Sequence, residues 1–67
     1  NIESYYFYKN KRWDLLFSDG LLVMLPSKNI DKSLNIFKKL SINNKLINIK
    51  IIDFRVANQV NLTNYDK

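Results

Sequence analysis

The segment from Arg12 to Pro26, RWDLLFSDGLLVMLP, constrains the fold of this chain more than any other part of the sequence. Its two apolar runs flank the dipeptide Asp19-Gly20, which readily takes the positive φ angles of a tight hairpin turn. We therefore expect strands over Arg12–Phe17 and Leu21–Leu25, and Pro26 ends the second because it has no N–H for the ladder. Both faces of this hairpin are largely apolar, so each face needs a cover.

One cover is predicted directly after the hairpin. Apolar residues recur there at i, i+4, i+7 and i+10, which is the spacing of one helix face, and polar residues lie between them. Ser27 or Asn29 can supply the N-cap. The pattern predicts an amphipathic helix that packs on one face of a sheet. Its predicted inward residues are Ile30, Leu34, Ile36, Phe37 and Leu40.

Three further strands complete the predicted sheet. Ile2–Tyr8 is rich in aromatic residues, Leu46–Phe54 is rich in isoleucine, and Gln59–Thr63 alternates apolar and polar residues. The order is β-β-β-α-β-β, so we predict an α+β fold with a mostly antiparallel sheet of about five strands and one helix on one face. The chain is expected to be a single domain, residues 1–67, with a frayed tail over 64–67.

The composition removes most routes to catalysis. The 67 residues include no cysteine and no histidine, which excludes a thiolate nucleophile, a histidine base and the commonest zinc ligands. A single glycine excludes a glycine-rich phosphate loop. The carboxylates are spread over different predicted elements, without acid–base or metal-ligand spacing. We expect no enzyme activity, no cofactor and no metal.

The basic charge leaves a second class of function open. The net charge is +5 and is mostly due to scattered lysines, which we interpret as a solvated surface. The alternative is a nucleic-acid-binding module that stacks bases on the aromatic residues of the first two strands. Strand alternation divides these residues between two faces. The candidates are Tyr5, Tyr6, Phe7, Tyr8 and Trp13.

The last predicted strand is a candidate binding edge. Val56–Asn64 has a polar outer face and contains no lysine or proline, the residues that commonly guard an exposed edge. An unguarded edge can recruit a strand from another protein. The strand could equally be internal or covered, and the sequence pattern leaves both placements open.

The order and spacing of these motifs resemble the C-terminal β domain of the bacterial cell-division family FtsQ/DivIB. The resemblance covers about Tyr8 to Thr63. The family pattern is approximately Arg-Trp-Asp/Asn-Leu-x-Leu-x-x-Gly, then Leu-Pro, a helix, and Ile-Asp-Leu-Arg before the final strand. Phe54 replaces the family's usual leucine, and Val56 stands where the family has an aromatic residue. The matching residues are Arg12, Trp13, Asp14, Leu15, Gly20, Leu25, Pro26, Ile52, Asp53 and Arg55.

The resemblance implies a non-catalytic scaffold on the periplasmic side of the bacterial inner membrane, anchored through a segment outside this chain. Its implied partners are the division proteins FtsB and FtsL, with FtsB adding a strand to the last strand of the domain. Arg55 is the implied charged anchor for a partner carboxylate. The implied contact residues are Arg55, Val56, Asn58, Gln59, Val60, Leu62 and Asn64. The competing hypotheses are the nucleic-acid module and a β-rich subdomain of an enzyme whose active site lies elsewhere.

The second face of the hairpin has no predicted cover within the chain. Leu16, Leu22 and Met24 alternate onto the face opposite the helix. The chain begins at Asn1 rather than at methionine, so we expect it to be a piece of a longer protein. We hypothesise that residues preceding Asn1 cover this face.

Overall fold

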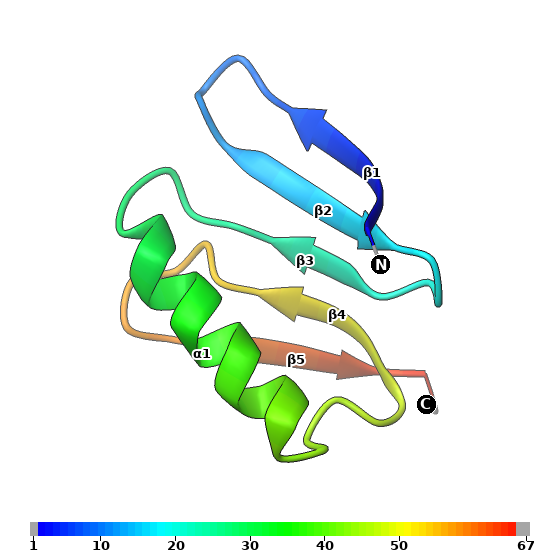
Figure 1. Cartoon of the computed structure of the whole chain (residues 1–67). Coiled ribbons are helices and arrows are strands. Elements are labelled where there is room, and N and C mark those ends of the chain that lie inside the picture. Colours follow the sequence, from blue (N-terminus) through cyan, green and yellow to red (C-terminus); the bar gives the residue numbers. More distant parts are fainter. Residues whose placement is uncertain (1, 66–67) are drawn as a thin grey trace.

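The fold is a five-stranded sheet with one helix on one face, as predicted. The structure is a computed structural model and describes residues 2–65. Figure 1 shows the helix lying across the part of the sheet formed by the later strands. The elements are β1 (Ile2–Phe7), β2 (Trp13–Phe17), β3 (Leu22–Met24), α1 (Ile30–Ile42), β4 (Ile49–Asp53) and β5 (Asn61–Asn64).

The strands lie in the sheet in the order in which they occur in the chain. β1, β2 and β3 form an antiparallel meander, β4 pairs with β3 in parallel, and β5 pairs antiparallel with β4. The helix is the crossover that a parallel pair of strands requires. Because the order is sequential, β1 and β5 are the two edges of the sheet.

The predicted hairpin turn is confirmed. Gly20 has a φ of 94°, its N–H donates to the Phe17 carbonyl, and the N–H of Phe17 donates to the Leu21 carbonyl. The Asp19 carboxylate accepts the N–H of Leu21 at 3.1 Å and braces the same turn. Past β3, the N–H of Leu25 still donates to Trp13, directly before the proline that ends the strand.

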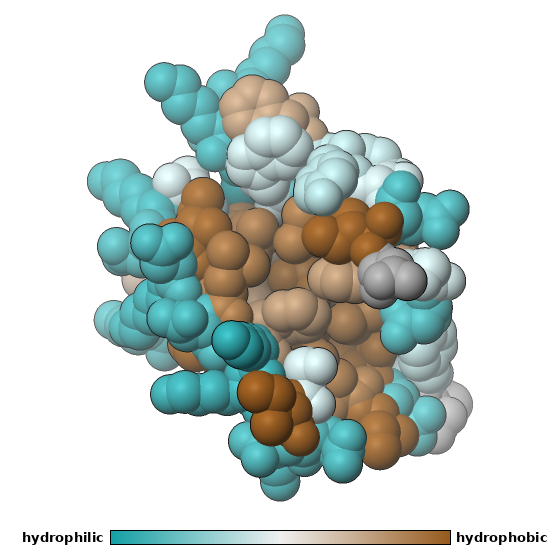
Figure 2. All heavy atoms as spheres, viewed as in Figure 1, coloured by the Kyte–Doolittle hydropathy of each residue, from teal (hydrophilic) through white to brown (hydrophobic). Residues whose placement is uncertain are grey.

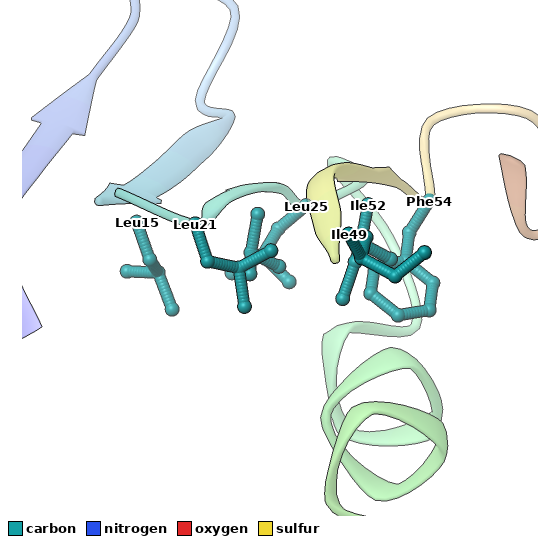
Figure 3. Packing of buried hydrophobic residues seen from close by; sticks show 7 residues of the cluster. Leu15, Leu21, Leu25, Ile49, Ile52 and Phe54 are labelled. Carbon is teal, nitrogen blue, oxygen red and sulfur yellow. The ribbon is translucent and has the colours of Figure 1, made fainter. Parts of the chain in front are cut away.

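The core lies between the sheet and the helix. Its buried side chains all come from the strands or from the residues next to them, and Figure 3 shows the labelled ones pointing to the side where the helix lies. Val23 and Ile52 are completely buried. Phe37 of the helix stacks against Phe17 with a centroid separation of 5.4 Å. The core residues are Leu15, Leu21, Val23, Leu25, Ile49, Ile52 and Phe54.

The helix packs on the sheet largely through the predicted face, with one exception at Leu34. Leu34 is 38% exposed, whereas Ser33 is only 7% exposed. Ile30, Ile36 and Phe37 do pack on the core. Ser33 is buried beside these residues and also lines the cleft next to Phe54, whereas Leu34 lies at the margin of the interface. Asn29 is the N-cap residue, but its side chain makes no capping hydrogen bond.

Most strand boundaries differ from the prediction by one to three residues, and the largest shifts are at the starts of β4 and β5. The helix continues to Ile42, β4 begins at Ile49 rather than Leu46, and β5 begins at Asn61 rather than Gln59. The late start of β4 has a local cause. Asn48 has a φ of 67°, outside the strand region, and the N–H of Ile49 donates to the Leu46 carbonyl to close a turn.

The end of the chain lies next to the sheet as far as it is described. Asn64, the first residue of the predicted tail, is the last residue of β5, and the N–H of Tyr65 donates to the Asn48 carbonyl at 3.0 Å. The last two residues of that predicted tail, 66 and 67, lie outside the described residues.

The opposite face of the sheet carries an apolar row. Leu16 pairs with Leu22, and Leu22 pairs with Ile51, so these three side chains lie side by side across β2, β3 and β4. Each is half-buried by its neighbours. Among residues 2–65, no second layer covers this face. That residues preceding Asn1 supply one stays a prediction.

Candidate functional site

The outer edge of β5 is the first component of the candidate site. Within residues 2–65, β5 pairs only with β4, and all of its residues are exposed. Figure 1 shows β5 at the border of the sheet, with the helix crossing in front of it. The sequence left open whether this strand is internal or an edge, and the strand order decides for an edge.

The direction of the β5 amides follows from one hydrogen bond. The N–H of Tyr65 points toward β4, where Asn48 accepts it. Successive N–H groups along a strand point to opposite sides. The N–H groups of Thr63 and Asn61 therefore point inward to β4, and those of Leu62 and Asn64 point out from the sheet. An incoming strand could bond to these outward groups.

The side chains of β5 differ between its two faces. Leu62 pairs with the buried Ile52, which places Leu62 on the helix side of the sheet. Asn61 pairs with Asp53 and Thr63 with Ile51, which places both on the opposite side. An added strand would meet an apolar side chain on one face and small polar side chains on the other.

A cleft of about 450 Å³ lies beside the start of β5. It separates the first half of α1 from the loop that joins β4 to β5. Three of its lining side chains are cationic, and none is acidic. Among its apolar lining residues, Phe54 belongs to the core, whereas Val56 and Val60 are partly exposed, at 48% and 36%. Its main lining residues are Lys28, Lys32, Ser33, Ile36, Phe54, Arg55, Val56, Asn58, Gln59 and Val60.

The loop between β4 and β5 is held by its own hydrogen bonds. The N–H of Gln59 donates to the Val56 carbonyl at 3.1 Å, and Asn58 takes a φ of 62°, a conformation that asparagine tolerates well. The Lys32 ammonium donates to the Asn58 side-chain oxygen at 3.5 Å across the cleft. A turn therefore lies at Val56–Asn58, directly before β5.

Arg55 is paired within the chain. Its Nε donates to Asp53 Oδ1 at 2.9 Å and its second guanidinium nitrogen, Nη2, donates to Oδ2 at 2.8 Å, which gives a forked ion pair. These hydrogen bonds from Arg55 hold the pKa of Asp53 below its ordinary value. About half of the Arg55 side chain remains exposed, so the pair fixes the guanidinium in place without hiding it.

A second arginine–aspartate pair lies on the same side of the sheet. Asp14 is only 3% exposed and accepts hydrogen bonds from Arg12 at 2.6 Å and from the Tyr8 hydroxyl at 3.0 Å. The bond to Asp14 raises the pKa of Tyr8 above its ordinary value. Asp14 and Asp53 both pair with Met24, from opposite sides. The Arg-Trp-Asp motif and the Ile-Asp-Phe-Arg motif, which both carried the resemblance, therefore each form an arginine–aspartate ion pair at the same end of the sheet.

The structure brings together only part of the predicted binding set. Arg55, Val56, Asn58, Gln59 and Val60 all line the cleft. The other two members, Leu62 and Asn64, lie farther along the free edge.

Sequence reasoning missed the helix side of the cleft. Lys32 and Ile36 line it, and Lys28 precedes the helix. Nothing in the local sequence marks these residues, because the parallel pairing of β3 and β4 is what places α1 beside the loop.

The aromatic residues of the first two strands do not form one platform. Phe7 pairs with Trp13 on the helix side, whereas Tyr6 pairs with Asp14 on the opposite side. This division agrees with the alternation predicted from the sequence. Among residues 2–65, there is no group of side chains that could hold a metal ion. That part of the chain also contains no helix of the length and hydropathy needed to cross a membrane.

The chain matches a known protein family over most of its length. Residues 1–55 match the family model described as cell division protein FtsQ/DivIB, C-terminal. This match spans β1 through β4 and ends at Arg55. No curated protein and no solved structure matches the chain.

Proposed function

The chain belongs to the C-terminal domain family of the cell-division protein FtsQ/DivIB, and we propose that it binds FtsB and FtsL by accepting a strand at the outer edge of β5. The family is a non-catalytic cell-division scaffold, so the domain is a protein-interaction domain of the division machinery. The family is membrane-anchored with a periplasmic C-terminal domain. We place this chain accordingly on the periplasmic side of the inner membrane.

The observation that carries the proposal is the free edge of β5. All residues of the strand are exposed, and its outward N–H groups at Leu62 and Asn64 have no partner strand among residues 2–65. Main-chain hydrogen bonds to such an edge provide affinity, and side chains at alternate positions provide specificity. We propose that the FtsB strand bonds to these amides and places an apolar side chain on Leu62.

The cleft supplies a second contact at the start of the edge. Val56 and Val60 offer apolar surface there, and Arg55 offers a guanidinium that Asp53 holds in a fixed orientation. A carboxylate of the partner would meet Arg55 together with the cationic Lys28 and Lys32. We propose that Arg55, Val56, Asn58, Gln59 and Val60 receive the end of the bound segment, while Leu62 and Asn64 pair with its middle.

Proline substitution tests the edge because it removes one N–H at a chosen side of β5. In Leu62→Pro the outward N–H is lost, so FtsB binding is expected to be abolished while the chain stays folded. Leu62→Ala is the matched control, since it shortens the side chain but keeps the N–H, and it should weaken binding only partly. In Asn61→Pro the lost N–H points to β4, so this variant should instead be destabilised.

The measurement is calorimetric titration of the chain with the periplasmic segment of FtsB, with circular dichroism to confirm folding. Wild-type affinity in folded Leu62→Pro would overturn strand addition at β5. Arg55→Ala tests the anchor separately, and we expect it to weaken FtsB binding about tenfold or more, the cost of one charge-assisted contact. Arg12→Ala is unsuitable as its control, because it would leave the buried Asp14 without its ion-pair partner.

A further inference from the structure

An exposed aromatic patch lies on β1 and β2, on the helix side of the sheet but outside the area that the helix covers. We define it as Tyr5, Phe7 and Trp13. Phe7 is 58% exposed and Tyr5 is 64% exposed. Trp13 packs against both, with centroid separations of 4.7 Å to Phe7 and 6.2 Å to Tyr5. Figure 2 shows this region of the surface as pale and light-brown residues above the brown centre of the same face.

Uncompensated positive charge adjoins the aromatic patch at one end. Phe7 and Trp13 form the ladder pair nearest the β1–β2 turn, and that turn carries the exposed Lys9 and Lys11. Arg12 also lies there, but its charge is balanced by Asp14 at 2.6 Å. Figure 2 shows long hydrophilic side chains projecting from this end of the molecule. The free cations of this region are therefore the two lysines.

We propose that the aromatic patch, together with Lys9 and Lys11, docks the domain on an anionic lipid surface. Tyrosine and tryptophan favour the membrane interface because one end of each ring is apolar and the other is polar. Each lysine at an anionic surface adds further attraction. The proposal rests on the periplasmic placement given under the proposed function, which sets the domain beside the inner membrane.

The geometry favours a lipid surface over a nucleic acid. Single-stranded nucleic acid needs ring faces open for bases and a cationic groove that follows the phosphates. Here Phe7 and Trp13 pack on each other at 4.7 Å, so these rings partly cover each other's faces. The two free lysines are gathered in one turn rather than spread along the strands. A flat lipid surface, which accepts aromatic rings and lysine ammonium groups at the same depth, fits this arrangement better than a nucleic-acid strand does.

Trp13 provides the readout, since it is the only tryptophan in the chain. The chain is mixed with vesicles of phosphatidylglycerol and phosphatidylcholine, or of phosphatidylcholine alone, and tryptophan emission is recorded. We expect a blue shift with the anionic vesicles and quenching by brominated lipid. The zwitterionic vesicles should give a much weaker shift.

Two pairs of variants locate the contact. Lys9→Ala with Lys11→Ala should lower partitioning into the anionic vesicles about 30-fold, whereas Lys38→Ala with Lys39→Ala removes the same charge from the helix and should change it little. Phe7→Ser should also weaken partitioning, and the equally exposed Ile42→Ser should not. Circular dichroism confirms that each variant is folded.

The proposal is overturned if the tryptophan emission maximum of the wild type does not shift with anionic vesicles. It is also overturned if the Lys38→Ala, Lys39→Ala variant loses as much vesicle binding as the Lys9→Ala, Lys11→Ala variant. A blue shift with a single-stranded thymidine oligonucleotide and none with vesicles would assign the aromatic patch to nucleic acid instead. The result is separable from FtsB binding. The Leu62→Pro variant should keep the wild-type emission shift with vesicles, and the Lys9→Ala, Lys11→Ala variant should keep the wild-type affinity for FtsB.

Discussion

The Tyr65 hydroxyl lies directly against Gly20, so close that a Cβ atom built on Gly20 would be 2.9 Å from the hydroxyl oxygen. The residue that follows β5 thus contacts the turn between β2 and β3, which lies on the far side of β3 and β4. The N–H of the same tyrosine bonds to Asn48. Since every residue of β5 is exposed, this contact helps to hold the proposed binding strand on the sheet.

Gly20→Ala should therefore destabilise the fold, by about 1–2 kcal/mol in urea unfolding, because alanine is strained at a φ of 94° and its Cβ meets Tyr65. The same substitution in a Tyr65→Phe background, which removes the hydroxyl, should cost less. If the cost is the same in both backgrounds, the backbone alone is responsible and the Tyr65 contact is unimportant.

Asp14→Asn should lower the free energy of unfolding by about 2–3 kcal/mol. The buried carboxylate accepts hydrogen bonds from Arg12 and Tyr8, and the substitution removes its charge. Asp31→Asn, at an exposed position in the first turn of α1, is the control and should cost below about 1 kcal/mol. The pKa of Tyr8 should also fall toward its ordinary value, measured by ultraviolet difference titration. An unchanged Tyr8 titration would contradict the role given to the hydrogen bond.

The pair formed by Asp53 and Arg55 predicts an acid-dependent loss of stability. Arg55 lowers the pKa of Asp53 in the folded chain below the ordinary value of 3.8, so folding favours the ionised carboxylate. This contribution is present above pH 3.8 and is lost as the pH falls through the lower native pKa. Wild type should exceed Asp53→Asn in urea midpoint at pH 7, and the difference should shrink below about pH 4. A difference that is independent of pH would contradict the assignment.

The difference in burial between Phe37 and Leu34 predicts unequal costs for substituting these two apolar residues of the helix. Phe37→Ala should cost about 2–3 kcal/mol because it removes the packing on Phe17, whereas Leu34→Ala should cost below about 1 kcal/mol because Leu34 is 38% exposed. Urea unfolding of the two variants gives the comparison. Equal costs would indicate that Leu34 is packed against the sheet as closely as Phe37, as the sequence pattern predicted.

Local chemistry in the sequence determined the elements and their order. The alternation of Tyr5 and Phe7 with Tyr6, the turn at Asp19-Gly20 and the end of the hairpin before Pro26 are each encoded in a few adjacent residues, and each is found as predicted. The helix and most of its inward face were predictable from its period, since Ile30, Ile36 and Phe37 pack on the core. The period did not show that Leu34 would be exposed and Ser33 buried, because a helix face includes neighbouring positions whose burial depends on how the helix lies on the sheet.

The strand order and the candidate site depended on the tertiary structure. That β3 and β4 pair in parallel, that β5 is an edge, and that Lys32 and Ile36 meet the loop after Arg55 are all relations between distant segments. Local periodicity does not contain them, because they are set by which strand edges pair when the helix buries the core. The sequence, through its family resemblance, indicated the strand that carries the proposed binding residues, and the sheet decided that this strand is an edge of the described part of the chain.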